Sequence, residues 1–363
     1  MQWSPQQDAA LKSVAEWLKQ DQPQVFRLFG YAGTGKTTLA RHIAEHEGGE
    51  VLFGAYTGKA ALVLRSKGCK DARTIHSMIY RPKSVDEEEP TFVLNEESAA
   101  ATASLIIIDE CSMVDEELGR DLLSFGKKVL VLGDPAQLPP VKGGGFFTGT
   151  EPDHMLTEVH RQAAGNPIIR LSMLVRAGER LARGAYGESR IIGRDEIDSA
   201  QVTKADQVLV GMNRTRHSYN KRLRELFGIT EALPQVNDKL VCLRNDRKKG
   251  LLNGGLWTVK KLLAKRGQHL RMHVVPEDDP ATKATRIGVL PQFFEGTGEE
   301  IPYALRRNSD EFDYGYALTV HKAQGSQWND LVLFDESAAF REHKNRWLYT
   351  GITRAAERLT LVV

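Results

Sequence analysis

The sequence is short of cysteines, of long apolar runs and of net charge, and each shortage argues against a class of protein. Its 363 residues include only three cysteines, Cys69, Cys111 and Cys242, which are far apart and form no CxxC pair. Such a set suits a reducing compartment and predicts neither a disulfide framework nor a cysteine-based metal site. The formal net charge is only +2, so the overall charge gives no signal for a nucleic-acid partner.

Membrane and export signals are also missing from the sequence. No apolar run approaches the length of a membrane-spanning helix, and the segment MQWSPQQDAA lacks the basic and apolar regions of a signal peptide. We therefore expect no membrane partner and a cytoplasmic location, in a cell or in a virus-infected cell. With 41% apolar and 26% charged residues, the composition is that of a globular protein with room for two or three domains.

The charge is unevenly distributed along the chain. Between Asp238 and Arg271 there are ten Lys or Arg residues against two Asp residues, whereas residues 86–97 are acidic. A local basic surface of this kind can hold phosphates. A charge run of this length is equally often a solvated face, so the sequence leaves both interpretations open.

The first 150 residues have the pattern of a parallel sheet covered by helices. Continuous apolar runs alternate with amphipathic segments, and this alternation is typical of an α/β domain whose strands are buried on both faces. We expect one such domain over residues 1–150. Its predicted strands are residues 25–30, 51–57, 103–110 and 128–134, with predicted helices over 6–20 and 37–47.

The second half of the chain changes texture twice. Residues 234–307 contain short strand-like runs separated by turn residues, which predict a small antiparallel barrel or sandwich. The flanking segments 151–233 and 308–363 return to α/β texture. We therefore expect a second α/β domain, built from these two segments, with an all-β module of residues 234–307 inserted in it.

A phosphate-binding loop is the most specific local motif. Residues 30–37, GYAGTGKT, fit the pattern G-x-x-x-x-G-K-[ST] between a predicted strand and a predicted helix. Glycines let backbone N–H groups wrap around phosphates, and the helix N-terminus adds a partial positive charge. Lys36 can reach the β- and γ-phosphates, and Thr37 can coordinate Mg²⁺. The predicted nucleotide-binding residues here are Gly30, Gly33, Gly35, Lys36, Thr37 and Thr38.

Two adjacent carboxylates, Asp109 and Glu110, follow an apolar strand. The carboxyl ends of parallel strands meet at the ligand crevice, so Asp109 can bind the metal ion and Glu110 can orient and deprotonate a water. A kinase needs no second carboxylate placed for water. The pair therefore favours hydrolysis of ATP over phosphoryl transfer to a small substrate, with ATP and Mg²⁺ as the expected cofactors.

These motifs and several others occur in an order that resembles the superfamily 1B helicases, specifically the RecD/Dda-like group. The resemblance covers nearly the whole chain. Among these matches, GDPAQLPPV and TVHKAQG are specific, whereas TIH is short. The matching segments are Gln7, GYAGTGKT (30–37), AYTGKAA (55–61), TIH (74–76), DECSM (109–113), GDPAQLPPV (133–141), LTEVHRQ (156–162), TVHKAQG (319–325) and YTGITRA (349–355).

The resemblance implies two RecA-like domains with an SH3-like module inserted in the second. It also implies roles at the nucleotide. Gln7 would read the adenine, Gln137 would sense the γ-phosphate, and Arg161 and Arg354 would reach that phosphate as arginine fingers. Because fingers of this kind act from a facing domain, they would contribute when the cleft between the domains closes.

The resemblance further implies contacts to the backbone of a single strand, which carry no sequence information. Relatives also carry a hairpin that splits the duplex, and residues 81–96 stand in its place here as a short, acidic segment. Phe92 is a candidate splitting aromatic or a buried anchor. Aromatic side chains that stack on bases are expected in a channel for single-stranded DNA. For Tyr80, Trp257 and Trp328, however, positions in the hydrophobic core are favoured. The predicted strand contacts are Thr57, Lys59, Thr74, His76, Thr319 and His321, although His76 and Thr319 also suit structural positions.

The leading hypothesis is an ATP-dependent DNA helicase that moves 5′→3′, the polarity that the resemblance implies. Its expected partners are single-stranded DNA and duplex/single-strand junctions, with replication or recombination proteins as further candidates. The alternatives are a translocase that strips proteins or serves a nuclease complex, and a nucleotide-switched binding module or small-molecule kinase. No residue excludes RNA as the track.

Overall fold

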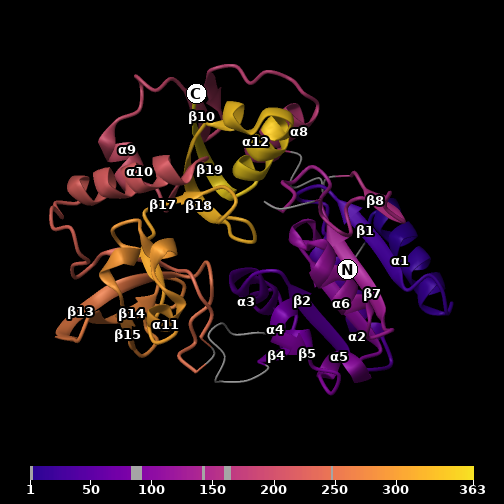
Figure 1. The fold of residues 1–363 in the computed structure, drawn as a ribbon. Helices are drawn as coiled ribbons and strands as arrows, with labels where there is room; N and C mark the ends of the chain where they lie inside the picture. The colour runs from indigo at the N-terminus through magenta and orange to yellow at the C-terminus, as the bar shows by residue number, and fades with distance from the viewer. Residues whose placement is uncertain (1–2, 83–91, 141–143, 159–164, 247) are drawn as a thin grey trace.

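The computed structural model describes residues 3–82, 92–140, 144–158, 165–246 and 248–363. It contains two six-stranded sheets, a five-stranded sheet and a two-stranded hairpin. Figure 1 shows three parts: an N-terminal unit in indigo to magenta, a second α/β unit that ends the chain in yellow, and an orange β insert. We call these the first unit, the second unit and the β insert.

The first unit is built on a parallel sheet with the strand order β3-β2-β6-β7-β1-β8. All of its strand pairs are parallel, as continuous apolar runs predict. Its last strand lies beyond residue 150, since β8 pairs with β1 through Leu28 and His154. The strands are β1 (Val25–Gly30), β2 (Val51–Ala55), β3 (Arg73–Thr74), β6 (Leu105–Asp109), β7 (Lys128–Gly133) and β8 (His154–Leu156).

Helices cover both faces of this sheet. One core cluster joins the strands to α1, α2 and α3, and a second joins them to α4, α5 and α6. Because side chains alternate along a strand, Leu28 enters the first cluster and Phe29 enters the second. The helices are α1 (Pro5–Leu18), α2 (Lys36–His46), α3 (Gly58–Ser66), α4 (Ile75–Ile79), α5 (Ala99–Thr102), the 3₁₀ turn η1 (Cys111–Met113) and α6 (Glu116–Leu123).

The second unit carries a sheet with the order β17-β11-β18-β19-β10-β9. Its pairs are parallel except for the edge strand β9. The parallel α/β fold predicted for both halves is thus confirmed. Its elements are α8 (Pro167–Arg176), β9 (Gly184–Tyr186), β10 (Ser189–Ile192), α9 (Ser199–Lys204), β11 (Gln207–Val210), α10 (Asn213–Leu226), β17 (Ala317–Thr319), β18 (Trp328–Phe334), η4 (Ser337–His343), α12 (Lys344–Ile352) and β19 (Ala355–Val362).

The β insert is a five-stranded antiparallel sheet with the order β15-β14-β13-β12-β16. Its strand β16 lies past residue 307, because Phe312 pairs with Cys242 of β12. Likeness to an SH3 module stays a prediction. The elements are β12 (Lys239–Cys242), β13 (Leu256–Arg266), β14 (His269–Pro276), β15 (Thr285–Val289), η2 (Pro291–Phe293), η3 (Gly298–Glu300), α11 (Tyr303–Arg306) and β16 (Phe312–Tyr314).

The basic run of the insert is partly neutralised by its own acidic residues. Lys239, Arg244 and Lys249 form ion pairs with Glu277, Glu311 and Asp310, respectively. Four exposed basic side chains lie along β13, namely Lys260, Lys261, Lys265 and Arg266, and Lys248 of the same run is exposed before that strand.

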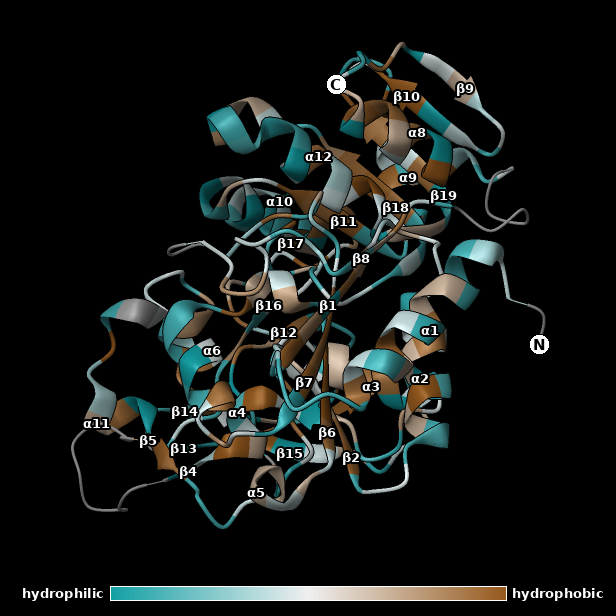
Figure 2. Ribbon diagram, turned by 90° about the vertical axis from the view of Figure 1, so that its right-hand side faces the viewer, coloured by the Kyte–Doolittle hydropathy of each residue, from teal (hydrophilic) through white to brown (hydrophobic). Residues whose placement is uncertain are grey.

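Figure 2 shows hydrophobic residues gathered in the strands and hydrophilic residues on the outer turns of the helices. Within the described part of the chain, no helix combines the length and apolar character needed to cross a membrane. The three cysteines are buried and unbridged.

Candidate active site

A concave site lies where the first unit faces the second. A cavity of about 660 Å³ lies beside the phosphate loop (residues 30–37), a volume within the usual range for ligand pockets. Its walls come from both units, which the sequence alone could not establish. The lining side chains include Lys36, Thr37, Asp109, Glu110 and Gln137 from the first unit, and Gln327, Thr353 and Arg354 from the second.

The phosphate loop has the conformation that its glycines predict. Gly33 and Gly35 have φ values of 80° and 84°, in the left-handed region that favours glycine. A side chain at Gly30 would meet Thr34 Oγ1 at 2.6 Å. The helix α2 begins at Lys36, within the last two residues of the loop, so its N-terminal N–H groups face the cavity.

Lys36 is folded into this loop. Its Nζ donates to the carbonyl oxygens of Gly30 at 2.6 Å and Tyr31 at 3.1 Å. The ammonium thus lies inside the curve of the loop, the position from which a lysine reaches phosphates. Gly33, Gly35, Lys36, Thr37 and Thr38 line the cavity, whereas Gly30 is not among its lining residues. Their binding of a nucleotide stays a prediction.

The two predicted metal ligands lie together. The Thr37 hydroxyl donates to Asp109 Oδ2 at 3.1 Å, although the two residues come from α2 and from the end of β6. Asp109 Oδ1 accepts the backbone N–H of Glu110 at 2.8 Å. An adjacent hydroxyl and carboxylate are hard oxygen ligands that suit Mg²⁺.

Glu110 has a strained backbone at the end of β6. Its φ of 53° is left-handed, which is uncommon for a residue other than glycine and is often found at functional sites. Burial raises the pKa of its carboxyl group, and the positive charges of Arg354 and Lys36 oppose that shift. A carboxyl group with a raised pKa suits a general base.

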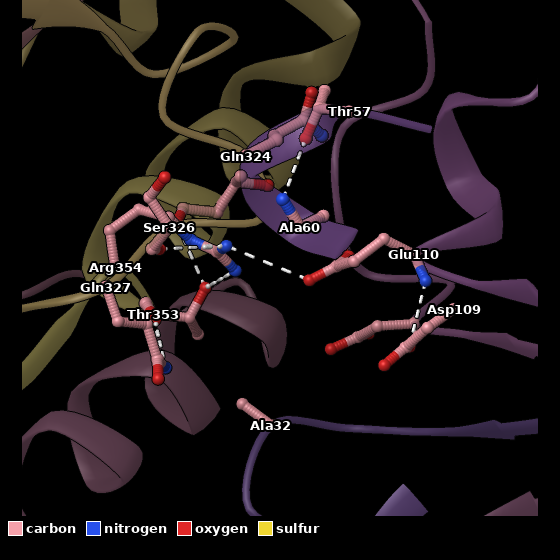
Figure 3. Close-up of polar contacts among 12 residues, drawn as sticks. Ala32, Thr57, Ala60, Asp109, Glu110, Gln324, Ser326, Gln327, Thr353 and Arg354 are labelled. Atoms are coloured by element: carbon pink, nitrogen blue, oxygen red, sulfur yellow. Dashed lines mark hydrogen bonds and ion pairs between the residues drawn. The ribbon is translucent and has the colours of Figure 1, made fainter. Parts of the chain in front are cut away.

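Arg354 reaches the cavity from the second unit, with only 4% of its surface exposed. Three neutral acceptors hold its guanidinium: the carbonyl oxygens of Thr350 at 3.1 Å and Ser326 at 3.3 Å, and the Thr353 hydroxyl at 3.2 Å. Its Nη1 lies 3.8 Å from Glu110 Oε1, and Figure 3 shows this pair spanning the two units. The predicted arginine finger therefore faces the predicted base.

Gln137 lines the same cavity. Its side chain is buried, with 7% exposed, and its Oε1 has no hydrogen-bond partner among the described residues. A buried amide oxygen without a partner is costly unless a donor satisfies it. Phosphate oxygens are acceptors, so the predicted contact with the γ-phosphate would use the Nε2 donors of this amide.

Arg161 and Gln7 are predicted to contact the nucleotide from outside the phosphate loop. Arg161 lies outside the described residues. Gln7 is buried at the start of α1, where its Nε2 donates to the Thr34 carbonyl at 3.1 Å and its Oε1 accepts the Ser4 N–H. It is thus tied to the phosphate loop, and its contact with adenine stays a prediction.

Sequence reasoning missed several residues at this site. Trp3 and Arg41 line the cavity on the side of α1 and α2. Tyr349 reaches the phosphate loop from α12. Trp3 precedes the helix that carries Gln7 and Tyr349 opens the motif that carries Arg354, so proximity to those motifs was the available signal.

The predicted strand contacts of the first unit follow β2 and β3. Thr57 and Thr74 cap the helices α3 and α4, accepting the N–H groups of Ala60 at 3.1 Å and Ser77 at 3.2 Å. His76 is exposed, beside the rings of Tyr56 and Tyr80. The capping contacts show that both threonines also have structural roles.

Lys59 has an acidic partner in the β insert. Its Nζ forms an ion pair with Asp278, and its side chain is 16% exposed. The insert also packs against the start of α3, where a side chain at Gly58 would meet Leu252 at 2.9 Å. A predicted phosphate contact is therefore neutralised by another part of the same chain.

In the second unit, Thr319 ends β17 and is buried, and its hydroxyl accepts the Lys322 N–H at 3.3 Å. His321 lies beside the ring of Phe340, and burial lowers its pKa. Gly325, in the same motif, lies across from Thr57, since a side chain there would meet Thr57 Oγ1 at 3.4 Å. The strand motifs of the two units thus adjoin.

The predicted wedge has a hairpin base. Strands β4 (Tyr80–Pro82) and β5 (Phe92–Leu94) pair antiparallel, while the tip, residues 83–91, lies outside the described residues. Phe92 is 60% exposed, so it is no buried anchor. Trp257, by contrast, is a core residue.

Comparisons with known proteins agree with this arrangement. Residues 2–194 match the family model of the AAA domain, and residues 314–362 match the UvrD-like helicase C-terminal domain. The ATP-dependent RecD2 DNA helicase of Deinococcus radiodurans is 31% identical over 366 residues, which cover 91% of this chain and 46% of that protein. The ATP-dependent DNA helicase dda of Enterobacteria phage T4 is 36% identical over 41% of this chain and 37% of its own length.

A crystal structure of Pif1 helicase from Candida albicans shares the fold, with a TM-score of 0.60 and 19% identity over 100% of this chain and 94% of that one. The chain spans less than half the length of the curated relatives named above.

Proposed function

The chain belongs to the superfamily 1B helicases of the RecD, Dda and Pif1 kind, and on that premise we propose that it is an ATP-dependent DNA helicase. It translocates along single-stranded DNA in the 5′→3′ direction, which is the polarity implied by its resemblance to the RecD/Dda group. Single-stranded DNA and duplex/single-strand junctions are its substrates.

The observation that carries the proposal is the meeting of Arg354 and Glu110, 3.8 Å apart, in the cavity that also holds Lys36. A cation from a second unit beside the candidate base makes hydrolysis depend on how the two units meet, which favours a motor over a nucleotide switch or a small-molecule kinase. Positioned cations of this kind stabilise the charge that develops during phosphoryl transfer.

The residues of the site divide the chemistry between them. Bound ATP with Mg²⁺ supplies the terminal phosphoryl group that is lost to water. Lys36 and the N–H groups of the phosphate loop bind the β- and γ-phosphates, and Thr37 and Asp109 hold the metal ion. Glu110 orients the attacking water and accepts its proton, while Arg354 and Gln137 contact the γ-phosphate.

Hydrolysis is coupled to movement because the site is divided. The first RecA-like domain, placed at residues 1–150 on sequence grounds, supplies the base. The second RecA-like domain, residues 151–233 and 308–363, supplies Arg354 and Arg161. ATP holds the two units in the arrangement in which Thr57 of the first unit lies beside Gly325 of the TVHKAQG segment, and opening after hydrolysis separates them. A DNA strand that is bound by both units is thereby advanced.

The strand contacts are backbone contacts from Thr57, Lys59, Thr74, His76, Thr319 and His321. The SH3-like β insert guides the strand through the exposed basic side chains of β13, since such side chains attract phosphates. Phe92 on the hairpin of residues 81–96 separates the duplex ahead of the moving strand. Its 60% exposure supports this role.

The proposal is tested by ATP hydrolysis with and without single-stranded DNA, followed by unwinding of forks with a 5′ or a 3′ tail. We expect strand-stimulated hydrolysis, unwinding from the 5′ tail, and no hydrolysis in Lys36→Ala. Hydrolysis indifferent to DNA refutes the motor, and unwinding only from the 3′ tail reverses the polarity. If single-stranded DNA stimulates ATP hydrolysis but no duplex is unwound, the protein is a translocase instead. If RNA stimulates hydrolysis more strongly than DNA, the protein moves along RNA.

A further inference from the structure

Tyr349 is a buried side chain that joins the two units at the nucleotide. It lies on α12 of the second unit with 1% of its surface exposed. Its hydroxyl group donates to Asp134 Oδ2 at 2.6 Å and accepts the N–H of Ala32 at 3.1 Å. These partners are 215 and 317 residues away in the sequence, so one hydroxyl connects α12, the phosphate loop and the segment after β7.

The surroundings keep this hydroxyl in its neutral, donating form. Burial, together with the adjacent Asp134 carboxylate, raises the pKa of Tyr349. Asp134 is itself buried, with 2% exposed, and its other carboxylate oxygen accepts the Ala136 N–H at 3.0 Å. A charged acceptor in a dry site makes a stronger hydrogen bond than a neutral one.

The segment bonded to Tyr349 is the one that carries Gln137. Two further contacts from the second unit hold the residue after it: Leu138 N–H donates to Thr350 Oγ1 at 3.0 Å, and Gln324 Nε2 donates to the Leu138 carbonyl at 3.2 Å. The Gln137 amide, whose Oε1 has no partner among the described residues, is therefore placed by atoms of the second unit.

A second contact reaches the phosphate loop from the same direction. The guanidinium of Arg176, at the end of α8, lies 3.5 Å from the centre of the Tyr31 ring. Arg176 and Tyr349 come from different helices, yet they touch neighbouring residues of the loop, Tyr31 and Ala32. The second unit is thus attached to the loop at two adjacent points.

We propose that Tyr349 is a positioning residue that aligns Gln137 with the phosphate loop through its two hydrogen bonds. The proposal rests on the function given above, in which Gln137 contacts the γ-phosphate. When the phosphate loop shifts on binding the nucleotide, the Ala32 N–H moves with it. Because the Tyr349 hydroxyl is bonded to both Ala32 and Asp134, Asp134 and the neighbouring Gln137 move as well. The phenol ring alone fills the core, whereas the hydroxyl carries the alignment.

The test is Tyr349→Phe, which keeps the ring and removes both hydrogen bonds. We expect kcat for ATP hydrolysis to fall about tenfold, or about 1.4 kcal/mol, with KM for ATP changed less than about twofold. Because the hydroxyl acts through Gln137, the double variant with Gln137→Ala should be no slower than Gln137→Ala alone. Tyr186→Phe is the matched control, since it removes a tyrosine hydrogen bond, to the Ala182 carbonyl at 2.8 Å, between residues that do not line the cavity.

Three results overturn the proposal. The first is unchanged kcat in Tyr349→Phe, and the second is multiplication of the two single effects in the double variant. The third is a lowered melting temperature that accounts for the whole loss of activity, because a residue needed only for packing would behave in that way. If the wild type hydrolyses ATP without stimulation by DNA, the motor proposal fails, while the comparison of variants remains decisive on basal hydrolysis. A wild type without any hydrolysis refutes both.

Discussion

Replacement of Arg354 tests the division of the site between the two units. The Arg354 guanidinium is held by Thr350, Ser326 and Thr353 and points at Glu110. Arg354→Ala removes the cation without touching the phosphate loop. ATP binding through the loop should therefore persist, while the transition state loses a positioned charge.

The expected loss follows from the geometry. Arginine fingers in other nucleotide hydrolases contribute about 10³–10⁵ in rate, and Arg354 is fully directed by its three acceptors. We expect kcat to fall at least about a thousandfold, or about 4 kcal/mol. Three neutral hydrogen bonds, each worth about 1 kcal/mol net, are lost as well, so the variant should also melt at a lower temperature.

The same substitution has a consequence for pH dependence. Burial raises the pKa of Glu110, and Arg354 is the largest influence that lowers it. Glu110 accepts a proton only when ionised, so hydrolysis falls as the pH drops through its pKa. Loss of Arg354 removes an opposing charge, and the acidic limb of the rate profile should move to higher pH.

The assay is strand-stimulated hydrolysis across the acidic pH range for wild type, Arg354→Ala and Arg354→Lys. The lysine variant keeps a charge but lacks the planar fork. Its acidic limb should therefore lie between those of wild type and Arg354→Ala, while its kcat stays close to that of Arg354→Ala. A variant retaining kcat within about threefold, or an acidic limb that moves to lower pH, would contradict the reasoning.

Three further outcomes follow from other contacts. Glu110→Gln should bind a fluorescent ATP analogue with affinity near that of wild type and show no turnover; loss of binding would make Glu110 structural. Asp278→Asn frees Lys59 and should raise affinity for an oligonucleotide about threefold at low salt and less at high salt, measured by anisotropy with Asp279→Asn as control; equal affinity in both variants would mean that the ion pair does not compete with DNA. Phe92→Ala should keep strand-stimulated hydrolysis and reduce fork unwinding several-fold, and normal unwinding would remove Phe92 from the wedge.

Much of the fold could be predicted because its signals are local. The run VFRLFG is β1 in full, and the strands expected over 103–110 and 128–134 are β6 and β7 with ends shifted by one or two residues. The antiparallel runs of the insert likewise became β12 to β15. The boundaries of the first unit and of the β insert were harder to predict, since β8 and β16 join their sheets from beyond the expected boundaries at 150 and 307. Pairing with a distant strand leaves no local signal.

Charge was the least predictable property of the candidate site. The run from Asp238 to Arg271 reads as one basic surface, yet Lys239, Arg244 and Lys249 are paired with acids that follow later in the chain. Lys59 belongs to a predicted strand motif but meets Asp278. Whether a charge is available to a phosphate depends on which side chains folding brings beside it.

The sequence by itself determined the phosphate loop, the carboxylates at the end of β6 and the order of the motifs. Each depends on residues within a few positions of one another, through glycine conformation, strand burial and helix capping. Only the tertiary structure decided that Arg354 faces Glu110, that Tyr349 joins Ala32 to Asp134, and that Lys59 is neutralised. Those contacts join residues from separately formed units, and their geometry is set by how the units pack.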